Sequence, residues 1–243
     1  MTGRLLASGG GPVIIPNFGH GSACLRRNGW LCLGWLRQHW GDTLQPALLQ
    51  HVELTVLAVG IGFGIAFLLA LAGFRFRLLD APLGAFTDVL YTIPSIAFFE
   101  LLIPLTGLTV TTIEIPLVSY TLFVLYRNLV AGLRGVPAEA LESARGMGMS
   151  RVQTFLRVEL PLAAPAVLGG VRVATVSTIS IATVAAFLIR EGLGFPIFDA
   201  LQQPGIFRTE LLAAGGLAIL LALVADGLLA LLQRAVTPWS RRP

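Results

Sequence analysis

The sequence predicts an all-α membrane protein, a polytopic helical bundle of about five transmembrane helices. Of its 243 residues, 55% are hydrophobic and only 12% are charged, and the mean hydropathy is +0.80. This composition makes lipid the preferred surroundings of the chain. The apolar residues also form long runs, and a spanning helix needs roughly 20 of them. Helices are expected in these runs because a helix satisfies its own backbone N–H and C=O groups, for which lipid offers no partners.

Five apolar runs are long enough to cross a membrane. In chain order they are Val52–Ala72, Leu83–Leu105, Ile113–Leu133, Leu162–Ile189 and Leu211–Leu232. The second run contains Pro94 and Pro104. Because proline removes a helical hydrogen bond and clashes with the preceding turn, we expect these two residues to bend this run and to open room near the middle of the bilayer.

The distribution of arginine predicts how the chain is oriented. The chain has 17 arginines and no lysine. They follow the first run, cluster between Arg127 and Arg157 and follow the last run, whereas Leu105–Thr112 has none. Basic residues accumulate on the cytoplasmic side of membrane proteins, so we expect the N-terminus outside and the C-terminus inside. The arginines are scattered along helix ends rather than gathered on one face, so a pI near 9.8 does not indicate nucleic-acid binding.

The first 47 residues are the least informative part of the sequence. Met1–Gly21 is rich in glycine and proline and is too weakly apolar for the core of a signal peptide. Trp30–Leu49 carries three tryptophans, which is typical of a helix that rests its rings at the headgroup level of the membrane. A tail packed on the bundle explains the same residues equally well.

The cysteines and histidines do not indicate a metal or redox site. Cys24 and Cys32 are too far apart for a C-x-x-C pair and lack neighbouring metal ligands, so we expect free thiols. His20, His39 and His51 do not have metal-ligand spacing, and we expect their side chains to be solvated or interfacial. Because every histidine precedes or begins the first apolar run, no catalytic constellation is expected within the bundle.

A polar insert, Glu142–Pro161, separates the third and fourth runs. Pro137 ahead of it suits the first turn of a helix, and Gly148 ends that helix. Ser150 can cap a second helix, because Gln153 three residues later completes a capping box. Four apolar residues fall on one face of the second helix: Val152, Phe155, Leu156 and Leu160. The pattern predicts two helices joined by a glycine turn, whose backbone a partner can approach closely.

This insert resembles the EAA signature of ABC importer permeases. The signature has a Glu-x-Ala start, a glycine six residues after the glutamate and an aliphatic-x-Leu-Pro close. The matching residues here are Glu142, Ala144, Gly148, Val158, Leu160 and Pro161, and Ser143 stands where the family more often has alanine. The resemblance implies that residues 134–160 form a cytoplasmic coupling loop. In the family this loop docks into a groove on an ATPase subunit and transmits its opening and closing to the membrane helices.

Other stretches resemble permeases for glycine betaine, carnitine and choline. They include YTIPSIAFFELLIPLTGL at Tyr91–Leu108, YRNLVAGLRGV at Tyr126–Val136 and the Gly-Leu-Gly of Gly192–Gly194, within a similar part that covers about Leu48–Leu232. Arg190–Glu191 departs from the small residues usual in the family. The resemblance implies a MetI-like permease fold and an ATP-driven importer for such osmoprotectants. An importer permease for another small solute, such as an amino acid, and a secondary transporter are the alternatives.

The resemblance also implies a transport subunit that is not an enzyme and binds no cofactor or metal. ATP and Mg are used by cytoplasmic ABC ATPase subunits, and an ordinary P-loop requires a lysine that this chain lacks. The other implied partners are an extracytoplasmic substrate-binding protein, a second permease copy or sister permease, and membrane lipid. The implied location is the bacterial inner membrane. The chain then divides into a tail with the interfacial helix (1–47), a transmembrane permease domain (48–233) that contains the coupling loop, and a cytoplasmic tail (234–243).

Ionisable residues within the apolar runs are candidates for lining a substrate pathway. Three of them are the candidates here: Glu100, Arg172 and Asp226. Each also has a structural explanation: Glu100 can pair within the bundle, Arg172 can snorkel to the cytoplasmic interface, and Asp226 can join helices near Arg234. Aromatic cages bind quaternary ammonium groups, but we expect the aromatic residues of the runs to be core or lipid-facing instead: Tyr91, Phe98, Phe99, Tyr120 and Phe123.

Overall fold

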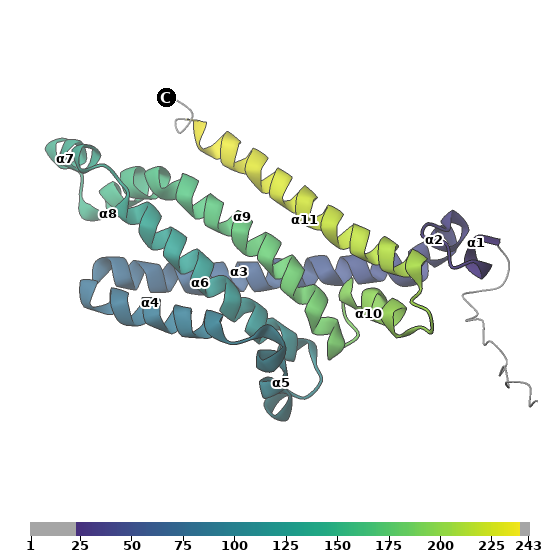
Figure 1. Ribbon diagram of the computed structural model, residues 1–243. Coiled ribbons are helices and arrows are strands. Elements are labelled where there is room, and N and C mark those ends of the chain that lie inside the picture. Colours follow the sequence, from purple (N-terminus) through teal and green to yellow (C-terminus); the bar gives the residue numbers. More distant parts are fainter. Residues whose placement is uncertain (1–22, 239–243) are drawn as a thin grey trace, which may run out of the picture.

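The computed structural model describes residues 23–238, and all the regular structure of this part is helical (Figure 1). Four helical stretches are long and apolar enough to cross a membrane, and their main helices are α3 (Gln45–Arg75), α6 (Val110–Arg134), α9 (Leu160–Val184) and α11 (Arg208–Val236). A fifth crossing is made if two shorter helices count together. The predicted all-α bundle of about five spans is confirmed.

The predicted span Leu83–Leu105, which was expected to bend, is two helices, α4 (Arg77–Thr92) and α5 (Ser95–Thr106), which meet at an angle of 94°. Pro94 stands at the break, as expected, whereas Pro104 lies inside α5. A residue before proline is disfavoured in helical conformation, and Ile93 is extended, with φ −69° and ψ 125°. The Tyr120 hydroxyl from α6 donates a hydrogen bond to the freed Ile93 carbonyl at 2.5 Å. A long-range contact therefore holds the break that proline starts.

The core is built around α6, which packs between α3 and α9. Its inward residues include Leu125, Tyr126 and Leu129, each about 1% exposed, and small residues face them from α3 and α9. A Cβ atom at Gly62 of α3 would collide with the Thr121 side chain, and one at Gly170 of α9 would lie 2.6 Å from Asn128 Cβ. Small residues let the three helix backbones approach closely, as membrane helices require.

The two ends of the bundle are built from different short elements (Figure 1). The short helices α7 (Ala138–Gly146) and α8 (Arg151–Thr154) lie at one end, where α3 also turns into α4. The opposite end carries α5, α10 (Gly194–Gln202) and the helices that precede α3. The predicted coupling loop thus lies far along the bundle from the N-terminal part of the described chain.

A disulfide corrects the prediction of free thiols. Cys24 and Cys32 are bonded to each other, with their Cα atoms 5.8 Å apart. The chain reverses between α1 (Ala23–Arg26) and α2 (Leu33–His39), and Asn28 takes a positive φ of 49° in this turn. The spacing rule for redox pairs does not consider such a turn, which brings the two side chains within bonding reach. We call residues 23–40 the N-terminal cap.

The N-terminal cap packs on the bundle and also exposes apolar side chains. Trp35 is 6% exposed and lies edge-on to Phe207, with ring centroids 5.2 Å apart. Trp30 and Trp40 are 60% and 44% exposed. A π turn at Trp40–Leu44 (η1) then leads directly into α3. Both explanations of the tryptophans therefore hold in part, because Trp35 is packed and the other two are free to meet an interface.

His51 corrects the prediction of solvated histidines, because its side chain is fully buried. Its Nε2 donates to the Ile179 carbonyl at 3.0 Å, and its Nδ1 accepts the Leu193 N–H at 3.2 Å. His39 is half-buried and stacks on the Trp35 ring, with centroids 4.5 Å apart. His20 and the rest of residues 1–22, and residues 239–243, lie outside the described part of the chain.

Candidate functional site

The predicted coupling loop begins with α7, which ends in the predicted glycine turn. Gly148 has φ +74°, a conformation that favours glycine. The Met149 N–H donates to the Ala144 carbonyl at 3.1 Å, and the Gly148 N–H donates to the Arg145 carbonyl at 2.9 Å. These two bonds form a Schellman motif, which satisfies carbonyl groups at the end of a helix. The predicted role of Gly148 in ending the helix is confirmed.

The second helix of the loop starts at the predicted capping box. The Ser150 N–H donates to Gln153 Oε1 at 2.8 Å, and the Gln153 N–H donates to Ser150 Oγ at 3.3 Å. The helix does not end with the loop. It passes from α8 through a π turn, Phe155–Glu159 (η2), into α9, so Arg151–Phe187 is one continuous apolar helix. The structure therefore joins the loop directly to a long helix of the bundle.

The loop presents apolar side chains to its surroundings. Met147, Val152 and Leu156 are 68%, 66% and 55% exposed. Of the predicted apolar face, Phe155 instead packs against the core, next to the buried Thr154. A cavity of about 620 Å³ lies between the loop and the end of α3; its lining includes Phe74, Arg75, Arg145, Met149, Val152 and Phe155. Exposed apolar residues beside a cavity are features of a docking surface.

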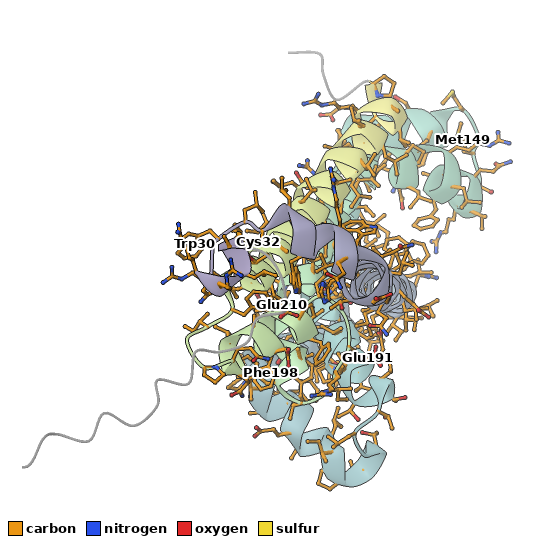
Figure 2. All side chains as sticks on the ribbon, turned by 90° about the vertical axis from the view of Figure 1, so that its right-hand side faces the viewer. Trp30, Cys32, Met149, Glu191, Phe198 and Glu210 are labelled. Atoms are coloured by element: carbon orange, nitrogen blue, oxygen red, sulfur yellow. A yellow bond between two sulfur atoms is a disulfide. The ribbon has the colours of Figure 1, made fainter. Side chains whose placement is uncertain are left out.

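The six residues of the signature fall into three groups by exposure. Glu142 and Gly148 are exposed at the tip of the loop, whereas Ala144 is fully buried. The other three are half-buried where the loop enters α9: Val158, Leu160 and Pro161. The alanine anchors the loop, and the glutamate and glycine remain available to a partner. Figure 2 shows Met149 of this loop on the far side of the molecule from Trp30 and Cys32 of the N-terminal cap.

The predicted pathway residues do not form one group. Arg172 on α9 and Asp226 on α11 pair with each other through two hydrogen bonds of 2.8 and 2.9 Å. Arg172 also donates to Gln233 Oε1 at 3.3 Å, and Gln233 donates to the Pro165 carbonyl at 2.9 Å. Asp226 thus joins helices, through Arg172. Glu100 is exposed on α5, so the three residues are not brought together, and their place in a pathway stays a prediction.

Sequence reasoning did not identify the two ion pairs between α4 and α6. Asp80 binds Arg134 at 2.9 Å and also accepts a hydrogen bond from the Tyr126 hydroxyl at 3.0 Å. Asp88 binds Arg127 at 2.5 Å. Asp80 and Asp88 are eight residues apart, as residues on one face of a helix are, so the spacing was a usable signal. Their partners, Arg127 and Arg134, lie on a separate helix, so the spacing within α4 could not predict them.

The Gly-Leu-Gly segment is fixed to α3 by buried contacts. Gly192 has φ +63°, and a Cβ atom there would lie 2.8 Å from His51 Nδ1. The Gly192 N–H donates to Gln50 Oε1 at 3.2 Å, and Leu193 is fully buried. A Cβ atom at Gly194 would collide with the Thr183 carbonyl. Residues 23–238 contain no group of three or more His, Cys, Asp or Glu side chains placed to hold a metal ion.

Comparison with known proteins identifies the family. The binding-protein-dependent transport system inner membrane component family matches residues 58–238. The chain belongs to this family. It is a multi-pass membrane permease subunit of the binding-protein-dependent transport systems, and the resemblance seen in the Glu142–Pro161 signature is confirmed.

Three curated relatives match most of the chain. The choline transport permease OpuBB of Bacillus subtilis is 33% identical over 205 residues, which cover 84% of this chain and 93% of the relative. The glycine betaine/carnitine/choline permease OpuCB of the same organism is 32% identical, over 78% of this chain and 86% of the relative. The osmoprotectant import permease OsmW of Salmonella typhimurium is 37% identical and covers 78% and 89%.

Solved structures show the same fold. An inward-facing MetNI methionine ABC transporter matches with a TM-score of 0.70 and 18% identity, over 83% of this chain and 98% of that one. An amino acid ABC transporter with histidines matches with a TM-score of 0.64 and 17% identity, over 83% and 97%. At this level of identity the likeness concerns the fold alone, and the predicted MetI-like permease fold is confirmed.

Proposed function

We propose that this chain forms the membrane pathway of an ATP-driven importer for osmoprotectants of the glycine betaine, carnitine and choline type. The observation that carries the proposal is the group of relatives described above, whose names specify choline, glycine betaine, carnitine or osmoprotectant transport. Each covers more than three quarters of this chain. The amino-acid importers share only the fold, so they do not favour an amino-acid substrate.

The coupling loop is the proposed contact with separate cytoplasmic ATPase subunits. It exposes Met147, Val152 and Leu156 around a glycine turn without side-chain bulk, which suits a partner that packs closely on the backbone. An equilibrium between inward-open and outward-open states shifts only when something binds one state better. ATP, with Mg, binds the partner subunits and supplies that difference. The continuous helix Arg151–Phe187 passes the resulting movement to the bundle.

The chain is proposed to lie in the bacterial inner membrane with its N-terminus outside and the coupling loop and C-terminus in the cytoplasm. The Cys24–Cys32 disulfide supports this orientation, because disulfides persist in oxidising compartments such as the periplasm and are rare in the cytosol. The N-terminal cap that carries it lies at the opposite end of the bundle from the coupling loop. An extracytoplasmic binding protein would deliver the solute there, and a second copy or a sister permease would complete the pathway.

The test is uptake of labelled glycine betaine and choline into proteoliposomes that contain the full transporter and its binding protein. ATP inside the vesicles should drive uptake, and vesicles without ATP should show none. A labelled amino acid serves as the comparison solute. Uptake of the amino acid in place of both osmoprotectants would overturn the substrate class and leave the permease assignment intact. Uptake that follows an ion gradient and ignores ATP would overturn the proposal as a whole.

A further inference from the structure

An ion pair lies deep within the apolar part of the bundle. Asp88 is about three turns into α4, and Arg127 is about two turns before the end of α6, so both lie well inside spans of a roughly 30 Å hydrocarbon layer. Their side chains are 41% and 53% exposed. Charges at this depth are costly against lipid and typically face the interior of a helix bundle or a water-filled cavity. We therefore expect the open side of this pair to face water in the assembled transporter.

Asp88 differs from Asp80 and Asp226, which also pair with arginines, in how its oxygens are satisfied. Asp226 uses both oxygens on Arg172, and Asp80 uses one on Arg134 and the other on the Tyr126 hydroxyl. Asp88 uses Oδ2 on Arg127, and its buried Oδ1 has no hydrogen-bond partner. Buried polar atoms are normally paired, so an unpaired one calls for an explanation. Of these three aspartates, Asp88 is therefore the one whose charge the described chain satisfies least.

Aromatic rings continue from this ion pair toward the break between α4 and α5. The Tyr91 ring stacks on Phe123 with centroids 4.4 Å apart, and the Arg127 guanidinium lies 6.0 Å from the Phe123 centroid. Tyr120 lies edge-on to both Tyr91 and Phe98, with centroids 6.1 and 6.0 Å apart. Tyr120 and Phe98 are buried, whereas Tyr91 is 45% exposed. The prediction that these rings are only core or lipid-facing does not explain why they gather beside a charged pair.

These residues are arranged on facing sides of two helices. Asp88 and Tyr91 are three residues apart on α4, and Tyr120, Phe123 and Arg127 recur at spacings of three and four on α6, so each set shares one face. The hydrogen bond from Tyr120 to the Ile93 carbonyl fixes these aromatic residues to the backbone at the helix break. Broken helices in membrane transporters occur where the backbone lines a cavity or is buried in protein. The cluster is thus a rigid polar and aromatic surface at a helix break.

We propose that Asp88, Arg127, Tyr91 and Phe123 form a binding site for a quaternary ammonium solute on its way through the membrane. This inference rests on the proposed function. A quaternary ammonium group cannot donate a hydrogen bond, and it binds to aromatic faces and to a carboxylate. The carboxylate of a zwitterionic solute pairs best with an arginine. Glycine betaine and carnitine would therefore exchange the Asp88–Arg127 pair for one contact with each member, whereas choline would use only Asp88 and the rings.

The selectivity between two solutes tests the site. Initial uptake of glycine betaine and of choline is measured in proteoliposomes with the complete transporter and a saturating binding protein. Arg127→Met should lower glycine betaine uptake about tenfold or more, which is the loss expected for one charge-assisted hydrogen bond, and should change choline uptake much less. Asp88→Asn should lower both. Tyr91→Leu should also lower both, whereas Tyr91→Phe should preserve both because it keeps the ring.

Two control variants distinguish a role of these residues in binding the solute from a role in holding α4 and α6 together. Arg134→Met removes the other α4–α6 ion pair and should not change the ratio of the two solutes. Arg127→Lys keeps the charge and should give a smaller loss confined to glycine betaine. Suppose that the parent protein imports both solutes. If Arg127→Met then lowers the uptake of both solutes equally, or lowers neither, the inference is overturned. If the parent imports neither solute, the proposed function fails, and this inference fails with it.

Discussion

The N-terminal cap and the coupling loop lie at opposite ends of the bundle and are stabilised in opposite ways. The cap is held by distant partners: Asn28 bonds to the backbone of Gly205, Ile206 and Arg208, and Thr209 donates to the Gly29 carbonyl. The disulfide closes it further. The turn of the coupling loop is held by local bonds, the Schellman motif and the capping box. The fold of the cap thus depends on contacts with distant parts of the chain, whereas the turn of the loop depends on its own residues.

The largest expected effect comes from filling the glycine turn of the loop. Gly148→Trp places a bulky ring on the surface where the ATPase is proposed to pack, so ATP-dependent uptake should fall to background. Gly148→Asn is the matched control, because asparagine tolerates the positive φ of this turn. It should retain most of the uptake. Transport is measured at equal membrane abundance, and full uptake by the tryptophan variant would contradict the docking surface.

A smaller effect is expected from reversing the exposed charge of the loop. Glu142→Lys leaves α7 intact, because lysine is about as good a helix former as glutamate. It should weaken the contact with the ATPase and lower uptake several-fold without abolishing it. The measurement is copurification of the ATPase together with uptake over a range of ATPase concentration. Uptake that does not recover at high ATPase concentration would show that Glu142 acts on something other than docking.

The Arg172–Asp226 ion pair between α9 and α11 should affect stability more than transport. Arg172→Met removes the partner of Asp226 and the bond to Gln233. We expect the thermal midpoint in detergent to fall by a few degrees, and the double exchange Arg172→Asp with Asp226→Arg to restore most of it. An unchanged midpoint in the single variant would show that this partly exposed pair contributes no net stability, as many such pairs do.

The smallest effect on uptake is expected at the cap. Replacing Cys24 and Cys32 by serine removes a covalent link across a short loop, which constrains the unfolded cap by about 2–3 kcal/mol in the chain-entropy account. Uptake should stay within about twofold, because the loss concerns local opening of the cap, which keeps its hydrogen bonds to residues 205–209 and lies far from the coupling loop. Hydrogen exchange of residues 23–40 should become faster. A loss of uptake as large as that of Gly148→Trp would contradict the expectation that the cap matters less for transport than the loop.

What the sequence predicts well is local. The apolar runs, the glycine turn at Gly148 and the capping box at Ser150 depend on residues a few positions apart, and the structure contains all of them. The break at Pro94 was also visible, although its sharpness depends on the Tyr120 hydroxyl of another helix. Helix period and capping residues are sufficient for such features.

What the sequence did not predict depends on distant contacts. His51 is buried because Ile179 and Leu193, more than 120 positions away, bond to both of its ring nitrogens. The two cysteines meet because Asn28 fixes the turn between them to residues 205–208. The Asp88–Arg127 pair joins separate helices. No periodic pattern within one segment contains this information.

In the proposed transporter, the continuous helix Arg151–Phe187 would carry movement from the coupling loop into the bundle. At about 1.5 Å per residue its 37 residues span about 55 Å, so it is a single lever with one arm in the coupling loop and the other beside the Gly-Leu-Gly segment. A stiff helix of this length carries a tilt at one end to the other end without an intervening loop. Its π turn at Phe155–Glu159 is the one compliant point beside the loop, so the stiffness of that turn should set how faithfully a push is delivered.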